Sequence, residues 1–81
     1  MNAEDDATIT AKVVREAAFP PSLRGYDPTE VDAVLDLIAD ALDRGERIDP
    51  AWLAAVEFRT TLRGYSRQTV DAFLEQLRMN L

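Results

Sequence analysis

Two pairs of acidic residues have the type and spacing needed to bind a cation. Asp32 and Asp36 are four residues apart, and so are Asp71 and Glu75. In a helix, residues at this spacing lie on one face. Two carboxylates so placed repel each other by about 0.2–0.5 kcal/mol, and a guanidinium between them relieves the repulsion and forms charge-assisted hydrogen bonds. Each pair is therefore suited to bind a basic group of a partner.

Two less specific explanations of the acidic pairs stay open. The carboxylates could form a solvated acidic face, or they could pair within the domain with Arg24 and Arg63. The first pair is followed along the same face by Asp40 and Asp43, whereas Arg78 follows the second. This difference favours the first pair over the second as the site for a basic group.

The acidic pairs belong to an internal repeat. Residues 9–42 align with residues 48–81 at an offset of 39 positions, and 11 of the 34 aligned residues are identical. A repeat of this kind determines the architecture of the whole chain. Units of this size are too small to bury much surface alone, so we expect 9–81 to share one core, after a disordered leader at 1–8 and with a linker at 43–47.

Helix signals recur in both units. Thr10 and Asp49 are expected to cap short helices, and the first of these is expected to run to about residue 18. Asp27 and Ser66 are expected to cap longer helices. A proline follows each of the two aspartates, at the first helical position. Glu30 is placed to close a capping box with its cap residue. Apolar residues then recur at helical spacing. This stripe consists of Val31, Leu35, Ile38 and Leu42, widened by Val34, Leu37 and Ala41, and of Val70, Leu74, Leu77 and Leu81 in the second unit.

The segments between the helices are expected to be loops. Gly25 is expected to adopt a backbone angle that other residues resist, and Gly45 to end the first long helix. Phe19, Phe58 and Trp52 are assigned to the core because small domains need large apolar groups inside. No strand pattern is evident. We therefore predict an all-α fold in which two tandem helix-loop-helix repeats pack as an internal pseudo-dimer, a four-helix arrangement.

Composition and charge narrow the function classes. The chain has no cysteine, and it has no histidine, which is the commonest general base and the commonest metal ligand in proteins. No set of residues suggests catalysis, a metal site or a cofactor site. The net charge of −6 disfavours binding to nucleic acid and favours binding to a basic partner. No apolar run is long enough to span a membrane and the first residues are acidic, so we expect a cytoplasmic protein.

The repeated motif resembles that of a known family. The pattern Phe-x(3)-Leu-Arg-Gly-Tyr-x(4)-Val-Asp-Ala-x-Leu, present twice, is similar to the N-terminal domain of the DivIVA/GpsB family of bacterial cell-division and polar-growth proteins, in the duplicated form seen in actinobacteria. The resemblance implies a non-enzymatic interaction module. Family members usually dimerise and continue into a long coiled coil, which this sequence does not sustain. A monomer with an internal twofold is therefore expected, and a homodimer is the alternative.

The resemblance implies two kinds of binding site. GpsB-like members bind arginine-containing tails of cell-wall proteins in a groove. The matching residues are Tyr26, Asp32 and Asp36 in the first unit, which its longer acidic row favours as the peptide site, and Tyr65, Asp71 and Glu75 in the second. DivIVA-like members dock on the inner face of the membrane through an exposed apolar residue and the arginine after it, which are Leu23, Arg24, Leu62 and Arg63 here. One leucine and one arginine per loop is a weak anchor. The alternatives are that both leucines pack into the domain, or that the motif is kept only for folding in a small helical partner or regulatory subunit.

Overall fold

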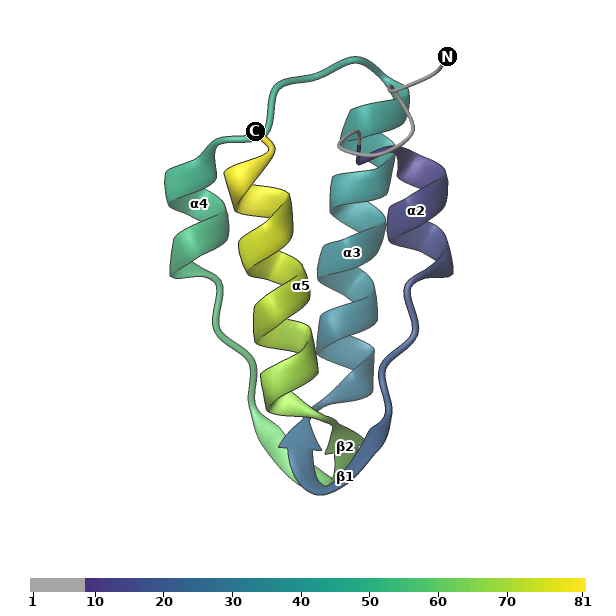
Figure 1. Cartoon of the computed structure of the whole chain (residues 1–81), viewed down its shortest axis with the longest axis vertical. Coiled ribbons are helices and arrows are strands. Elements are labelled where there is room, and N and C mark those ends of the chain that lie inside the picture. Colours follow the sequence, from purple (N-terminus) through teal and green to yellow (C-terminus); the bar gives the residue numbers. More distant parts are fainter. Residues whose placement is uncertain (1–8) are drawn as a thin grey trace.

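The computed structural model of the chain describes residues 9–81, so the leader expected at 1–8 lies outside the described residues. The elements in chain order are α2 (Ala11–Glu16), β1 (Pro21–Tyr26), α3 (Pro28–Asp43), α4 (Pro50–Ala55), β2 (Thr60–Tyr65) and α5 (Arg67–Met79). Each unit is thus a short helix, a strand and a long helix. The long helices stand in the middle, the short ones lie outside them, and both strands lie together at one end (Figure 1).

The prediction of an all-α fold is wrong, because the two segments expected to be loops form a two-stranded sheet. Pro21 lies opposite Tyr65, and Arg24 lies opposite Leu62. Residue numbers rise along one strand as they fall along the other, so the pairing is antiparallel, with an irregular register. The strands come from different units, and neither shows the alternation of apolar and polar residues that marks a strand in a sequence.

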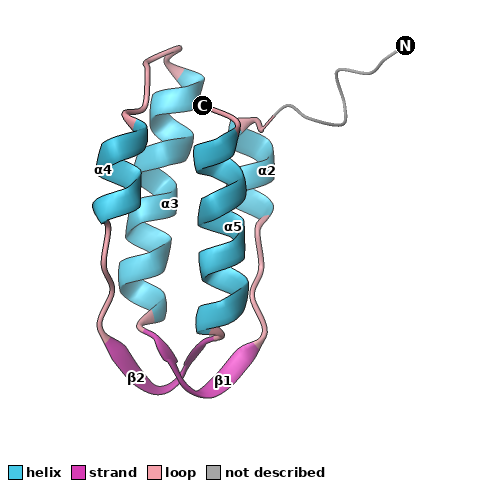
Figure 2. Ribbon diagram, turned by 60° about the vertical axis from the view of Figure 1, so that its left-hand side comes forward, coloured by secondary structure: helices cyan, strands magenta, loops and turns pink. Residues whose placement is uncertain are grey.

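Reciprocal hydrogen bonds extend the pairing beyond the strands. The backbone N–H of Asp27 donates to the carbonyl of Arg59 at 2.8 Å, and that of Ser66 donates to the carbonyl of Pro20 at 2.9 Å. These two bonds occupy equivalent positions in the repeat, each running from the start of a long helix to the other unit. The chain segments cross at the end of the molecule, as Figure 2 shows. Each long helix is therefore anchored at its N-terminus by the opposite unit.

Gly25 and Gly64 make the crossing possible. A Cβ on Gly25 would lie 2.7 Å from the carbonyl carbon of Tyr65 and 2.8 Å from that of Gly64, and a Cβ on Gly64 would lie 2.5 Å from the carbonyl carbon of Gly25. The expectation that Gly25 has an unusual backbone angle is wrong, since the positive-φ glycine of the described residues is Gly45, at 68°. Glycine is required at the crossing for close approach of the backbones, not for its conformational freedom.

The helix starts follow the sequence signals closely. The side chains of Thr10, Asp27, Asp49 and Ser66 each accept a hydrogen bond from a backbone N–H in the first turn of the helix that follows, which confirms all four caps. The first helix ends at Glu16, two residues before the expected position. These positions depend on local chemistry, which explains why sequence signals identified them.

The capping box expected at Glu30 is absent. Its carboxylate instead accepts the backbone N–H of Arg59 at 2.7 Å and pairs with the guanidinium of that residue at 3.4 Å. The N–H of Asp27, which a capping box would have used, already donates to the carbonyl of Arg59, just before β2. A tertiary contact has therefore replaced a local one.

The end of α3 confirms the role expected for Gly45. The N–H of Gly45 donates to the carbonyl of Leu42 at 3.1 Å, and the N–H of Glu46 donates to that of Ala41 at 2.9 Å. With the positive φ of Gly45, these two bonds form a Schellman motif. The motif satisfies carbonyl groups that the end of a helix would leave unpaired.

The core is formed by ten buried residues from both units, of which Val31, Val70 and Ala39 are fully enclosed. The ten are Ala11, Val14, Val31, Leu35, Ile38, Ala39, Ile48, Leu53, Val70 and Leu77. Phe19 and Phe58 are half-buried against this cluster. The assignment of Trp52 to the core is wrong, since it is 42% exposed, and Leu37 of the predicted stripe is 59% exposed.

The crossing predicts a large cost for adding one methyl group. In Gly25→Ala, the new Cβ would overlap the backbone of the opposite strand, and we expect a loss of about 3 kcal/mol of unfolding free energy. Gly45→Ala is the matched control, because a Cβ there meets open space and costs only the strain of a positive φ, about 1–2 kcal/mol. Urea denaturation followed by circular dichroism measures both. A Gly25→Ala loss no larger than that of Gly45→Ala would contradict the role given to the crossing.

Candidate partner-binding groove and strand tip

The two tyrosines bind aspartates of the opposite unit. The Tyr26 hydroxyl donates to Asp71 Oδ1 at 2.8 Å, and the Tyr65 hydroxyl donates to Asp32 Oδ1 at 3.1 Å. The sequence grouped each tyrosine with the acids of its own unit, and the structure exchanges these groupings. The predicted site residues therefore come together as two mixed pairs, one on each side of the molecule.

Both phenols have a raised pKa. For Tyr26 and for Tyr65, the larger cause is partial burial, which disfavours the charged phenolate, and the second is the hydrogen bond to the aspartate. The negative charge of each aspartate acts in the same direction. The tyrosines are therefore held protonated, as hydrogen-bond donors that fix the position of a carboxylate.

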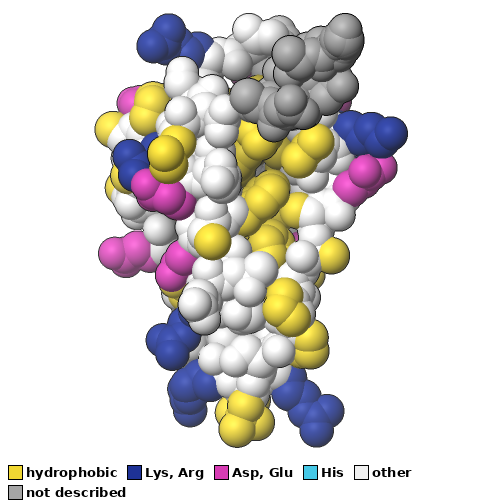
Figure 3. Space-filling model, viewed as in Figure 1, with side chains coloured by type: hydrophobic (Ala, Val, Ile, Leu, Met, Phe, Trp, Pro, Cys, Tyr) yellow, Lys and Arg dark blue, Asp and Glu magenta, His cyan; other side chains and the backbone are white. Residues whose placement is uncertain are grey.

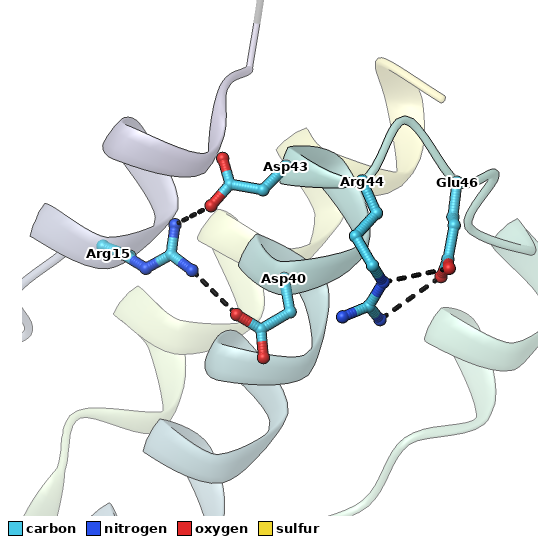
Figure 4. A network of polar contacts seen from close by, with 5 residues as sticks. All are labelled: Arg15, Asp40, Asp43, Arg44 and Glu46. Carbon is cyan, nitrogen blue, oxygen red and sulfur yellow. Dashed lines mark hydrogen bonds and ion pairs between the residues drawn. The ribbon is translucent and has the colours of Figure 1, made fainter.

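The additional acids of the first unit are paired within the domain. Arg15 on α2 donates to Asp40 and to Asp43 on α3, each at 2.8 Å (Figure 4). The hydrogen bond that Arg15 donates to Asp43 is the largest cause of the raised pKa of Arg15. The same figure shows Arg44 bound to Glu46, at 2.9 Å. The internal partner of these acids is thus Arg15, and the reason for preferring the first unit as the peptide site no longer holds.

The remaining acid of the first pair, Asp36, is exposed. Within residues 9–81 it takes part in no ion pair. Asp32 lies one turn earlier, where it accepts the hydroxyl of Tyr65. The first acidic pair therefore lies on an open helix face.

The second acidic pair lies in a groove. Asp71 and Glu75 line a hollow of about 340 Å³ between α4 and α5. Its other lining residues are Leu53, Ala54, Val56, Leu74 and Arg78. Arg78 donates to Glu75 at 2.5 Å, and this hydrogen bond is the main cause of the lowered pKa of Glu75. The groove thus combines carboxylates with an apolar wall, and a guanidinium already occupies part of it.

The four residues predicted to contact a membrane lie in the crossing strands. Leu23 is 80% exposed and Leu62 is 65% exposed, so the alternative that they pack into the domain is wrong. Figure 3 shows hydrophobic side chains at this end of the molecule with Lys and Arg side chains on both sides. Arg24 and Arg63 are exposed and form no ion pair among the described residues, so pairing with the helix acids is not observed.

The sequence placed Arg78 beside the second acidic pair, and its i,i+3 spacing from Glu75 makes the two residues neighbours on a helix, where they form an ion pair. Sequence reasoning did not identify Arg15 as a cation of the first unit's acids. The pairing of Arg15 with acids 25 and 28 residues away had no such signal. A polar hollow of about 350 Å³ was also missed. It is lined by Ser22, Arg24, Tyr26, Ser66, Arg67, Gln68 and Asp71.

Two kinds of site are not found in the described part of the chain. Residues 9–81 contain no group of three acidic side chains arranged to hold a metal ion. None of the helices between these limits is both long and apolar enough to cross a membrane.

The exchanged pairs make a prediction for tyrosine ionisation. We expect both tyrosines to ionise above their ordinary pKa of about 10, and Asp71→Asn to lower the pKa of Tyr26, though not to its ordinary value, because burial persists. A raised phenol pKa stabilises the fold below pH 10, and this contribution is lost as pH rises through the folded-state pKa. Absorbance at the phenolate band against pH measures both residues, and Asp36→Asn serves as the control. An equal effect of the two substitutions would contradict the pairing.

In comparisons with known proteins, no family model, no curated protein and no solved structure matches the chain.

Proposed function

We propose that this chain is a non-enzymatic, DivIVA/GpsB-like interaction module that docks on a membrane surface through the tip of its crossed strands. The observation that carries the proposal is the exposure of Leu23 and Leu62, at 80% and 65%, in the two strands that meet at one end of the molecule. Large apolar side chains held in solvent by a glycine crossing have no packing role in the fold. These side chains are available for burial in the apolar part of a membrane surface.

The crossing of the strands doubles the number of side chains that can anchor the molecule to a membrane. One leucine with one arginine is a weak anchor, but the sheet brings two leucines and two arginines to the same end of the molecule. Full burial of a leucine is worth about 1.5–3 kcal/mol, and each basic residue near an anionic surface adds about 1 kcal/mol. The combined anchor supports reversible binding to a membrane rich in anionic lipids.

The charge distribution supports the same orientation. Although the chain carries a net charge of −6, the charged side chains around the hydrophobic tip in Figure 3 are Lys and Arg, and the Asp and Glu side chains on this face lie above it. Other Lys and Arg side chains lie higher, among these acids. An anionic surface attracts nearby basic groups and acts only within about 8–10 Å at physiological salt. The tip therefore faces the membrane while the acidic helices point away from it.

Vesicle binding tests this function. We expect the wild-type chain to sediment with vesicles of phosphatidylglycerol, and Leu23→Ser with Leu62→Ser to abolish binding. Leu37→Ser is the matched control, since Leu37 is 59% exposed on α3 but lies outside the strands. Raising the salt concentration should weaken binding by the wild-type chain. Equal binding by the double variant and the control would contradict membrane docking through the tip.

A second candidate function is capture of an arginine-containing peptide. The observation that favours it is the groove between α4 and α5, where Asp71 and Glu75 face an apolar wall. Tyr26 fixes one oxygen of Asp71, and the second oxygen has no hydrogen-bond donor among the described residues. A ligand guanidinium would displace Arg78 from Glu75 and bind both carboxylates.

The repeat supplies a matched control for this groove. Glu75→Gln should weaken binding of an arginine-containing peptide by about tenfold, because a charge-assisted hydrogen bond is lost. Asp36→Asn, at the equivalent position of the first unit, should have no effect. Isothermal titration calorimetry measures both. A larger loss in Asp36→Asn would place the site on α3 instead.

These two activities belong to different surfaces of one module. The membrane tip lies at the strands, and the groove lies between α4 and α5 along the helices. In line with the family resemblance, we infer a role at the cytoplasmic face of the membrane in bacterial division or polar cell-wall growth. There the module would present its groove to the basic tail of a partner protein.

A further inference from the structure

The two halves of the molecule differ at one aromatic cluster. On one side, the ring of Phe19 contacts Tyr65, with centroids 5.4 Å apart, and Phe73, at 5.7 Å in an edge-to-face arrangement. On the other side, Phe58 contacts Tyr26 at 5.2 Å. The repeat places a valine, Val34, where the first cluster has its third ring, Phe73.

The missing ring coincides with a hollow in the surface. A space of about 530 Å³ is lined by Glu30, Ala33, Val34, Glu57, Phe58 and Arg59. This volume falls in the range of small-ligand sites. Aromatic rings prefer edge-to-face or offset contacts, and the filled side shows such a contact at the equivalent position. The molecule therefore contains its own example of the group that fits here, a phenyl ring packed beside a phenylalanine.

The charges around the hollow define a second feature of its occupant. At the equivalent positions the filled side has only neutral residues, namely Thr69, Ala18 and Pro20 in place of Glu30, Glu57 and Arg59. Arg59 pairs with Glu30 at 3.4 Å. Glu57 is exposed and forms no ion pair among residues 9–81, so the rim carries one uncompensated negative charge. A positive group on the ligand would complement it.

We propose that this hollow binds an aromatic side chain of a partner polypeptide in which a lysine or arginine is adjacent to the aromatic residue. The ring lies on Val34 and Phe58, as Phe73 lies on Phe19, and the cation meets Glu57. Leu37, one turn further along α3 and 59% exposed, extends the apolar surface for the flanking residue of the ligand. This site is separate from the acidic groove between α4 and α5 and from the strand tip.

The experiment is a titration of the isotope-labelled chain with capped dipeptides, followed by amide chemical shifts. Acetyl-Phe-Arg-amide is expected to shift the amides of Ala33, Val34 and Phe58 and to saturate at millimolar concentration. Acetyl-Ala-Arg-amide and acetyl-Phe-Glu-amide are the matched probes, and each is expected to bind about tenfold or more weakly. Because this comparison uses the unaltered chain, it does not depend on the folding of any variant.

Two variants locate the binding. Val34→Phe fills the hollow with the residue that the other half uses, so it should fold normally and bind acetyl-Phe-Arg-amide at least tenfold more weakly. Glu57→Gln should reduce the preference for arginine over glutamate beside the aromatic residue. Equal binding by Val34→Phe, equal binding of the Ala-Arg probe, or shifts confined to Asp71 and Glu75 would each overturn the proposal. Shifts at the hollow that depend on protein concentration without peptide would identify a second copy as the occupant, and would overturn it too.

Discussion

The close passage of two backbones at Gly25 and Gly64 decides where the other elements of the molecule lie. Because neither glycine has a side chain, the strands cross in contact, and the first turns of α3 and α5 are hydrogen-bonded to the opposite unit. The same crossing carries each tyrosine to the aspartate of the other unit and leaves both leucines facing solvent. The peptide groove, the aromatic clusters and the exposed tip all depend on that one contact.

Local features of this fold could be predicted from the sequence, because neighbouring residues determine them. The four helix caps and the Schellman motif at Gly45 depend on chemistry within a few positions of the chain. The strands could not be predicted in this way, since the partner of each is 39 residues away in the repeat. An isolated two-stranded ribbon is only marginally stable, and here its stability comes from the helices that it joins.

The candidate sites show the same limit. Sequence reasoning named the acids and the tyrosines, but their pairing is decided by the exchange between units, which no local spacing encodes. It assigned Trp52 to the core because the residue is large and apolar, whereas its helix has only six residues and turns that ring partly to solvent. Exposure depends on how a helix is rotated in the assembled domain, and a hydrophobic pattern determines that rotation only roughly.

The joining of both strands in one chain has a consequence for molecular symmetry. In a twofold assembly of identical chains every substitution occurs twice, so both sides must present the same surface. Here each position of the repeat can differ from its counterpart, as Val34 differs from Phe73 and Asp36 from Glu75. The encounter of the strands is also intramolecular, and dilution does not weaken it. A domain in which two unlike units share one sheet can act as a heterobivalent adaptor, which holds two different ligands in a fixed mutual orientation.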